Sequence, residues 1–176
     1  TINLVNNSGL IFNQTAAGTF AGGVAGTGTL TKEGSQSLTI SGDLGANVST
    51  MLDAGTLELG GASLDSAITA SNNTTVIFQR STGNSTLAGD LTGTPTLVEK
   101  TGASTLIFSG DKSYIAPTVI NAGTLLLRGN LVGTTNTTVA SGATLEVDGA
   151  VVRSLSGDLD VAGRLSTTQA NSVLSV

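Results

Sequence analysis

The sequence contains no cysteine and no histidine, and each absence removes a class of chemistry. Without cysteine the chain can form neither disulfide bonds nor thiolate metal sites. Without histidine it lacks the usual general base of a Ser-His-Asp hydrolase. Aromatic residues make up only 3% of the chain and charged residues only 11%, about half the charged fraction of an average globular protein. The core must therefore be built from Leu, Val, Ile and Ala.

Positive charge is also scarce, because the seven Lys and Arg residues are scattered along the chain and the net charge is −5. A nucleic-acid partner needs clustered basic side chains, so we do not expect one. The mean hydropathy of +0.27 argues against disorder, which combines low hydrophobicity with high net charge. No apolar run approaches the roughly 18 residues of a membrane-spanning helix.

What the sequence does contain is internal repetition. Four pairs of segments match at a nearly constant offset along the chain: Ile2–Phe12 with Ile68–Phe78, Gly18–Leu30 with Ser85–Leu97, Gly26–Asp43 with Gly93–Asp111, and Asp53–Leu59 with Asn121–Leu127. We therefore divide the single domain 1–176 into two copies, approximately 2–61 and 68–129, and a partial third copy, 130–176. Repeats of this kind are typical of solenoids.

Within each copy, short runs alternate between aliphatic and hydroxyl-bearing residues, as in 37–40 (SLTI) and 143–147 (ATLEV). Alternation with a period of two predicts β-strands with one buried face, and we find no helical periodicity. Short strands in repeats of this length favour a right-handed parallel β-helix, a β-solenoid, with roughly 18–25 residues per rung and about eight or nine rungs. We expect positive φ angles at four glycines near strand ends and both prolines at strand boundaries: Gly42, Gly55, Gly110, Gly123, Pro95 and Pro117.

Two segments resemble the passenger-associated repeat of autotransporters, the type V secretion systems of bacteria. The better copy reads STLIFSGDKSYIAPTVINAGTLLLRG (104–129), and a weaker copy reads QSLTISGDLGANVSTMLDAGTLELGG (36–61). The resemblance implies a right-handed parallel β-helix, a fragment of a longer passenger that is exported to the bacterial cell surface or secreted. It also implies a partner, the passenger's own C-terminal outer-membrane β-barrel, which lies outside this fragment.

Carboxylates are the remaining candidates for catalysis or metal binding: Asp43, Asp53, Glu58, Asp111, Glu146, Asp148, Asp158 and Asp160. We interpret Asp43 and Asp111, in matched Ser-Gly-Asp turns, as structural caps. Asp148, Asp158 and Asp160 lie close in sequence, with Asp158 and Asp160 on either side of Leu159, and could bind Ca²⁺, but a solvated outer face is the favoured interpretation. We therefore predict no catalytic, cofactor-binding or metal-binding residue, no cofactor and no enzymatic activity. The glycosylation sequons at Asn13, Asn84 and Asn136 are attributed to the turn-rich composition.

The leading functional hypothesis is a structural and presentation segment of a secreted passenger, which supports surface display and offers a side for adhesion, host-molecule binding or self-association. One alternative is a carbohydrate-active β-helix enzyme with acidic residues in a long groove. Another is a binding surface made of flat threonine arrays, for which Thr27/Thr29 and Thr94/Thr96 are the clearest pairs in the two copies.

Overall fold

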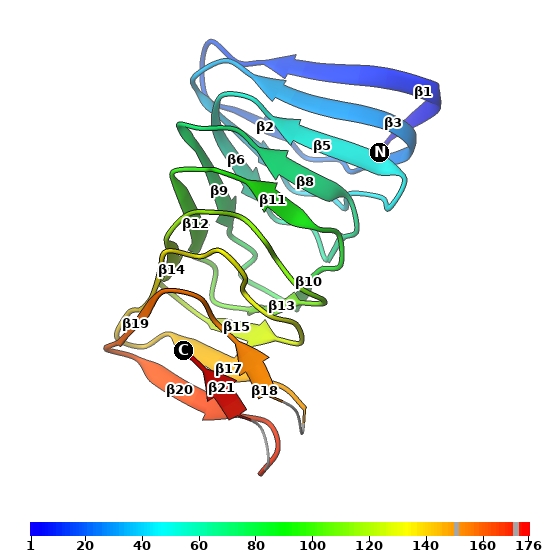
Figure 1. The fold of residues 1–176 in the computed structure, drawn as a ribbon. Coiled ribbons are helices and arrows are strands. Elements are labelled where there is room, and N and C mark those ends of the chain that lie inside the picture. Colours follow the sequence, from blue (N-terminus) through cyan, green and yellow to red (C-terminus); the bar gives the residue numbers. More distant parts are fainter. Residues whose placement is uncertain (150–151, 171–172) are drawn as a thin grey trace.

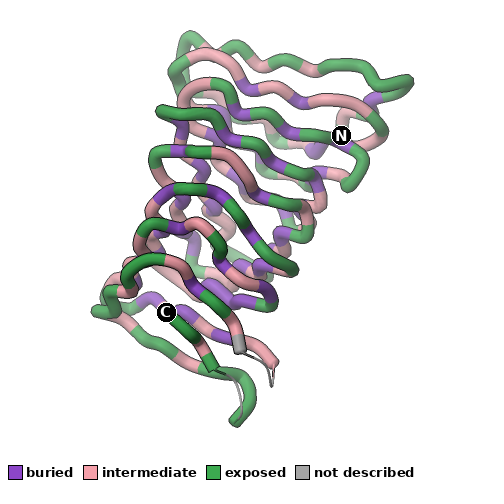
Figure 2. The backbone as a smooth tube through the Cα atoms, viewed as in Figure 1, coloured by how far each residue is buried: buried purple, intermediate pink, exposed green. Residues whose placement is uncertain are grey.

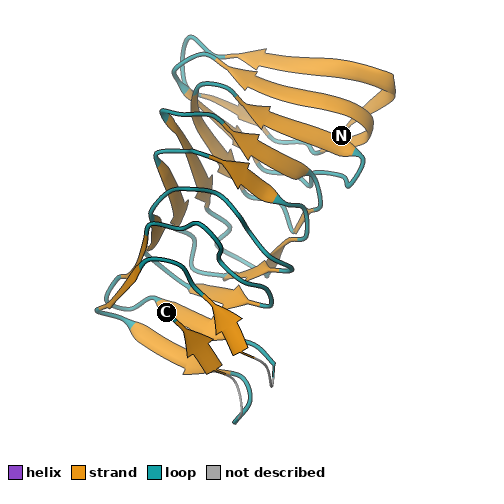
Figure 3. Cartoon of the chain, viewed as in Figure 1, coloured by secondary structure: helices purple, strands orange, loops and turns teal. Residues whose placement is uncertain are grey.

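The protein is a coil of stacked parallel strands, seen in a computed structural model that describes residues 1–149, 152–170 and 173–176 (Figure 1). Every regular element among the described residues is a strand, and none of them forms a helix (Figure 3). Accordingly, no helix suited to crossing a membrane is found in the described part of the chain. The all-β prediction is confirmed.

Each turn of the coil has three sides, which carry three main parallel sheets. The first sheet comprises β1 (Ile2–Asn13), β3 (Val24–Glu33), β5 (Val48–Leu52), β8 (Ala67–Ala70) and β11 (Leu91–Gly93). The second sheet comprises β2 (Gly18–Phe20), β4 (Ser37–Ile40), β6 (Gly55–Leu59), β9 (Thr74–Phe78), β12 (Leu97–Lys100), β14 (Thr118–Ile120), β16 (Asn136–Val139) and β19 (Asp158–Val161). The third sheet comprises β7 (Ser63–Leu64), β10 (Ser85–Leu87), β13 (Thr105–Phe108), β15 (Thr124–Leu127), β17 (Thr144–Val147) and β20 (Arg164–Thr167). A short sheet pairs β18 (Val152–Ser154) with β21 (Val173–Ser175).

The pairing register shows how long each turn is. Paired residues lie between 18 positions apart, as for Thr50 and Ile68, and 24 positions apart, as for Leu131 and Leu155. The second sheet has one strand from each turn, and its eight strands therefore mark about eight turns. The predicted β-solenoid of short rungs is confirmed.

The core is a set of aliphatic ladders that run along the axis of the coil. In the third sheet, for example, Leu64, Leu87, Phe108, Leu127 and Val147 stand in register, and all five are buried. Buried and exposed residues alternate along most of the chain, whereas both ends of the coil are largely exposed (Figure 2). Because each inward side chain packs on its equivalents in the neighbouring turns, a thin core needs few aromatic rings.

The first sheet becomes narrower along the coil, while the third sheet replaces it. Strands of the first sheet shorten from 12 residues in β1 to three in β11. The third side begins as single bridges at Val24, Leu44 and Leu64 and then widens to the four-residue strands β13, β15, β17 and β20. Beyond β11 the first side is in turn reduced to bridges, which join Lys112, Leu131 and Leu155. The irregular side of the coil thus moves from the third side to the first.

This shift explains the offset between the sequence copies. Leu38, in β4 of the second sheet, matches Leu106, in β13 of the third sheet. From β4 the second sheet passes through β6 and β9 to β12, three turns on, and β13 is one side further. A copy therefore spans three turns and one side, and equivalent residues of the two copies lie on different sides of the coil.

The glycine predictions are confirmed at three of four positions. Gly55, Gly110 and Gly123 have φ angles of 72°, 84° and 68°. Gly42 is not among the residues with positive φ, so that expectation was wrong. Glycine is needed there for a different reason, since a Cβ atom on Gly42 would lie 2.3 Å from the backbone nitrogen of Gly23 in the preceding turn.

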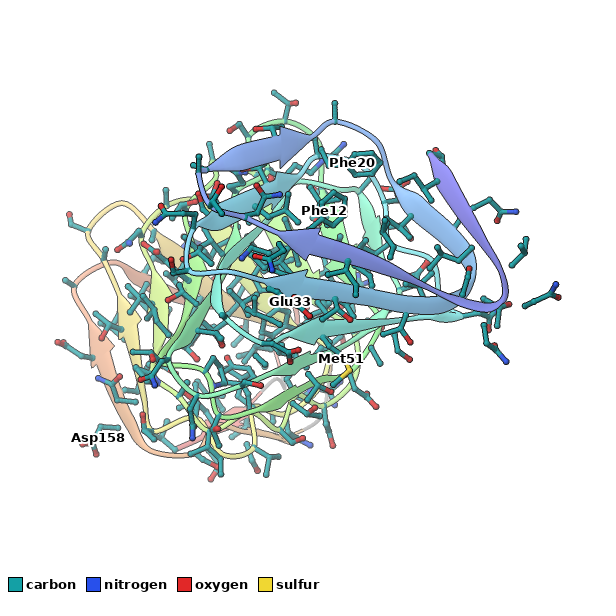
Figure 4. The ribbon with its side chains drawn as sticks, turned by 90° about the horizontal axis from the view of Figure 1, so that it is seen from above. Phe12, Phe20, Glu33, Met51 and Asp158 are labelled. Atoms are coloured by element: carbon teal, nitrogen blue, oxygen red, sulfur yellow. The ribbon has the colours of Figure 1, made fainter. Side chains whose placement is uncertain are left out.

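The two ends of the coil differ. At the N-terminal end Phe12 and Phe20 lie side by side, with ring centroids 5.6 Å apart (Figure 4). At the C-terminal end the inward positions are open, and Leu165, which stacks under the buried Leu145, is 46% exposed. Pro95 and Pro117 lie between strands, as predicted.

Candidate functional site: buried polar side chains that join the turns

Two lysines are buried at corners of the coil and bind backbone carbonyl oxygens. The ammonium group of Lys32 donates to the carbonyls of Glu33, Gly34 and Ala54, over distances of 2.7, 2.8 and 3.1 Å. Lys100 donates in the same way to Gly102 and to Ala122, the latter at 3.2 Å. In both cases the alanine belongs to the next turn. Each of these lysine corners, as we name them, therefore fastens two successive turns together.

The lysine corners satisfy carbonyls that the strand ladders leave behind where the chain bends. A buried carbonyl without a donor costs free energy, so a long side chain that reaches the corner from inside is favoured. Burial also penalises the charged form, and it lowers the pKa of Lys100 to about 8. Burial likewise lowers the pKa of Lys32. Both ammonium groups bind carbonyl dipoles and no carboxylate.

Lys112 is a third buried lysine, placed where the first copy has Leu44. Its ammonium group donates to the carbonyl oxygens of Ser109 (2.9 Å) and Gly110 (3.3 Å) and lies 5.8 Å from the ring centroid of Phe108. Burial lowers the pKa of Lys112, while the charges of Asp90 and Asp111 act in the opposite direction. This lysine closes the turn that follows β13.

A chain of buried hydroxyl groups lies in the same turn. The phenol of Tyr114 is 2.6 Å from the hydroxyl oxygen of Thr118, which is 3.0 Å from that of Thr134 in the next turn. The hydroxyl oxygen of Thr134 lies 3.0 Å from the carbonyl oxygens of both Ala116 and Asn136, which share its one proton. Burial raises the pKa of Tyr114 well above its ordinary value, so the phenol stays protonated. The network is fully satisfied and joins two turns inside the core.

The aspartates of the two Ser-Gly-Asp turns join turns from the outside. One carboxylate oxygen of Asp43 accepts from the backbone nitrogens of Ala62 (2.8 Å) and Ser63 (2.9 Å). Asp111 accepts from the backbone nitrogen of Asn130 at 2.7 Å and from its side-chain amide at 2.9 Å. The prediction of a structural role is confirmed, but these aspartates cap the following turn of the coil and not their own.

The segment 128–130 (Arg-Gly-Asn) also joins turns from the outside. The side-chain oxygen of Asn130 accepts from the backbone nitrogen of Ser154 at 2.8 Å, so it joins a further turn. The guanidinium of Arg128 forms an ion pair with Asp148 at 2.7 Å, and the hydroxyl of Thr168 donates to the same carboxylate. These hydrogen bonds lower the pKa of Asp148, with that from Thr168 the largest contribution. Asp148 is therefore tied to both neighbouring turns.

Asp158 and Asp160 both lie on β19, the last strand of the second sheet, and both are exposed. Asp158 projects from the periphery of the coil in Figure 4. Among the described residues, no group of three or more His, Cys, Asp or Glu side chains is arranged to hold a metal ion. Calcium binding by Asp158 and Asp160 stays a hypothesis, which calcium titration tests.

A solvent-open hollow of about 720 Å³ lies over the irregular third side of the first turns. The residues that line it include Gly22, Gly23, Gly42 and Gly45, together with Asp43, Ser63 and Asp65. Asp43 is occupied by the bonds described above, and Asp65 accepts from the Ser63 hydroxyl at 2.7 Å. The hollow therefore brings together two carboxylates that already cap backbone and side-chain groups.

The two threonine pairs do not form one array. Thr29 lies in β3 of the first sheet, next to the exposed Thr27, whereas Thr94 and Thr96 flank Pro95 in the corner that precedes β12. The first sheet does have an outward row of side chains in register, from Ile11 through Thr31, Met51, Thr69 and Thr92. Hydroxyl and aliphatic groups are mixed in this row, and Met51 is 41% exposed.

Sequence reasoning missed the buried lysines and the buried tyrosine, because Lys was treated as a surface residue. A signal was present. In both copies a glycine follows the lysine at the second position, as Gly34 follows Lys32, and an Ala-Gly pair comes one turn later. Repetition of a charged residue at an inward position of a strand, combined with that spacing, would have indicated a corner.

Comparison with known proteins gives one match. Residues 98–127 match the family model of the passenger-associated-transport-repeat. This range holds the Lys100 corner, Lys112, Tyr114, Thr118 and Asp111, so several of the polar contacts between turns lie within the matched repeat. No curated protein and no solved structure shows a significant match to the chain.

Proposed function

We propose that the segment is a non-catalytic structural element that supports display at the cell surface, because the matched repeat and the β-solenoid together fit a fragment of an autotransporter passenger. The repeat family implies export to the cell surface or secretion. The proposed partner is the outer-membrane β-barrel of the same passenger. Adhesion or binding of host molecules along a side of the coil is the finer form of the proposal.

One observation carries the proposal: the repeat supplies internal polar contacts that join consecutive turns. A passenger that crosses the outer membrane as an extended chain must fold turn by turn, because each turn contacts only its neighbours. A newly formed turn is stable only when its corner carbonyls find donors. Lys100 reaches Ala122 in the next turn, and Thr118 contacts Thr134 in the turn after that. The repeat would thus hold the growing end of the coil in register.

The test is a display experiment in a bacterium that carries an autotransporter barrel. The chain is fused to that barrel, and surface exposure and protease resistance of the passenger are measured. We expect the double variant Lys100→Met/Lys112→Met, inside the matched repeat, to reduce protease-resistant passenger at the surface at least several-fold. Arg164→Met, an exposed residue of β20, serves as the matched control and should leave display unchanged.

Two outcomes would overturn the proposal. Undiminished, protease-resistant display of the double variant would show that the internal contacts of the repeat do not support folding at the surface. Cleavage of a polysaccharide by the purified chain, lost in the variant Asp43→Asn/Asp65→Asn, would favour the alternative of a carbohydrate-active β-helix enzyme, with its carboxylates in the hollow on the third side.

A further inference from the structure

We propose that asparagines at the beginnings and ends of the strands of the first sheet are sites of N-linked glycosylation, with Asn6, Asn13, Asn47 and Asn73 as the acceptors. Each begins an Asn-x-Ser/Thr sequon, the sequence pattern of N-glycosylation acceptors in secreted proteins. The modification is separate from the proposed structural role and uses residues that take no part in the core.

Sequons are more frequent here than composition explains. The chain has 12 asparagines, and 47 of its 176 residues are Ser or Thr, so about three sequons (12 × 47/176) would be expected by chance. Seven occur: at Asn6, Asn13, Asn47, Asn72, Asn73, Asn84 and Asn136. All of them except Asn136 lie in the N-terminal half of the chain. Eight of the 12 asparagines lie in that half, and six of these eight begin a sequon, against one of the four in the C-terminal half.

The coil gathers these positions around one surface. Asn6 lies between the two parts of β1 that pair with β3, 2–4 and 8–13, and Asn47 directly precedes β5, on the same side of the sheet. Asn13 ends β1, and Asn73 lies in the turn after β8, so both lie on the side where the strands of the first sheet end. Residues that are far apart in sequence thus lie along the two sides of a single sheet, where its strands begin and where they end.

The acceptor side chains are accessible. All four asparagines are exposed, and Asn6 and Asn73 have φ angles of 54° and 61°, which place them at sharp bends. In the described part of the chain, the side-chain amides of Asn6, Asn47 and Asn73 make no hydrogen bond. The side-chain amide of Asn13 donates one, of 3.3 Å, to the carboxylate of Glu33. Within the sequons, Ser8, Thr15 and Ser49 are exposed, and Thr75 is half-buried.

The remaining sequons provide internal comparisons. The hydroxyl group of Thr74, which completes the Asn72 sequon, is buried and donates to the carbonyl of Ser71 at 2.6 Å. Asn72 itself accepts a hydrogen bond from Thr94. Asn136 lies within β16, half-buried and paired with Asp158 of β19. These two positions should stay unmodified, whereas Asn84, exposed in the loop before β10, is accessible but lies outside the first sheet.

The chemical step is transfer of a sugar from an activated donor. The amide nitrogen of asparagine forms a bond to the anomeric carbon, the bond from that carbon to the donor's phosphate oxygen breaks, and the phosphate leaves with the electron pair. The amide loses one proton to the transferring enzyme. The donor is a sugar activated by phosphate, either nucleotide-linked or lipid-linked, and the two sources leave different products.

The test is peptide mapping by mass spectrometry of the passenger purified from the bacterium that makes it. We expect sugar on the peptides that carry Asn6, Asn13, Asn47 and Asn73, and none on Asn72 or Asn136. A single monosaccharide at each site indicates a nucleotide-linked donor, and a uniform oligosaccharide indicates a lipid-linked donor. Unmodified asparagines at all four positions, or sugar confined to Ser and Thr, would overturn the proposal.

Variants separate modification from folding. Asn47→Gln and Ser49→Ala each destroy the same sequon, the second without touching the asparagine, and both should remove the sugar at position 47 and leave Tm unchanged. Thr75→Ala is preferred at the fourth site, because Asn73 has a positive φ that glutamine tolerates poorly. Asn72→Gln is the matched control and should leave the modification pattern intact. Persistence of sugar on Asn47 in Ser49→Ala would show that the sequon is not what is recognised.

Discussion

The two copies of the repeat place the same contacts on different sides of the coil. In the first copy the lysine corner closes the first side and the Ser-Gly-Asp turn leads to the third side. In the second copy the corner closes the second side, and the Ser-Gly-Asp turn leads to the first. The contacts are thus properties of the local sequence and not of a particular side. The second copy adds Lys112 and Tyr114 to the core, where the first copy has Leu44 and Ala46. Thr118, in contrast, has a buried counterpart in Thr50, whose hydroxyl lies 2.7 Å from that of Ser66.

The largest expected effect is on the hydrophobic core, in both copies. Ile40 and Phe108 occupy matched inward positions, and both are buried. We expect Phe108→Ala to lower the free energy of unfolding by about 3–5 kcal/mol and Ile40→Ala by about 2–5 kcal/mol, because each leaves a cavity in a ladder. Urea unfolding followed by circular dichroism measures both.

Phe108 should be the more costly of the pair, since its ring also packs edge-on against Phe78 at 5.7 Å. Ile107→Ala, at the outward neighbour, is the control and should cost about 1 kcal/mol or less. A loss for Phe108→Ala no greater than that of the control would contradict the packing described for the third sheet.

The lysine corners come next. We expect Lys32→Met and Lys100→Met each to lower the free energy of unfolding by about 1–3 kcal/mol, because corner carbonyls lose their donors inside the protein. Equal losses would show that the corner works the same way on either side of the coil. Unchanged or increased stability of both variants would mean that burial of the charge outweighs its hydrogen bonds.

A smaller effect should appear with alkaline pH. The pKa of Lys100 is lowered to about 8, so in this range the unfolded chain binds more protons than the folded one, and stability should rise as pH increases from 8 toward 10. Above about 10 the trend should reverse, because the pKa of Tyr114 is raised by burial and only the unfolded tyrosine ionises readily. Thermal unfolding across this range measures the rise. A flat profile for the wild type, or an undiminished rise in Lys100→Met, would contradict it.

The smallest effect concerns the aspartate caps. Hydrogen bonds from Asn130 lower the pKa of Asp111 below its ordinary value of 3.8, so its contribution is present above that pH and is lost as pH falls through the folded pKa. We expect Asp111→Ala to cost about 1 kcal/mol at neutral pH and little in strong acid. Asp158→Ala, on the exposed last strand, is the matched control. Equal losses from both variants at neutral pH would show that the hydrogen bonds of Asp111 do not stabilise the fold.

The fold followed from the sequence because its strongest signals are periodic. Alternation in segments such as 37–40 fixes which side chains point inward, and the matching copies argue for a coil and against a sandwich with hairpin turns. The shift of one side per copy could not be predicted from the sequence, because it depends on the number of residues in each turn, which varies along the coil. The role of Gly42 was missed for a similar reason: its neighbour in space, Gly23, lies in another turn.

The polar contacts were harder to predict than the core. Asp43 and Asp111 were recognised as structural from their matched turns, but their partners lie one turn further along the chain and depend on the register of the turns. Lys100 and Tyr114 have side chains that usually reach solvent. Burial of Lys100 becomes favourable because corner carbonyls accept its hydrogen bonds, and burial of Tyr114 because the Thr118 hydroxyl pairs with its phenol.

The three-turns-and-one-side length of a copy has a consequence for any longer rod assembled from such copies. A group attached at the same position of every copy would be rotated by one side of the coil from each copy to the next. It would return to its starting direction only after three copies, about 48 Å along the axis at about 4.8 Å per turn. Ligands approaching from any direction would then meet the same chemistry, at heights fixed by the pitch.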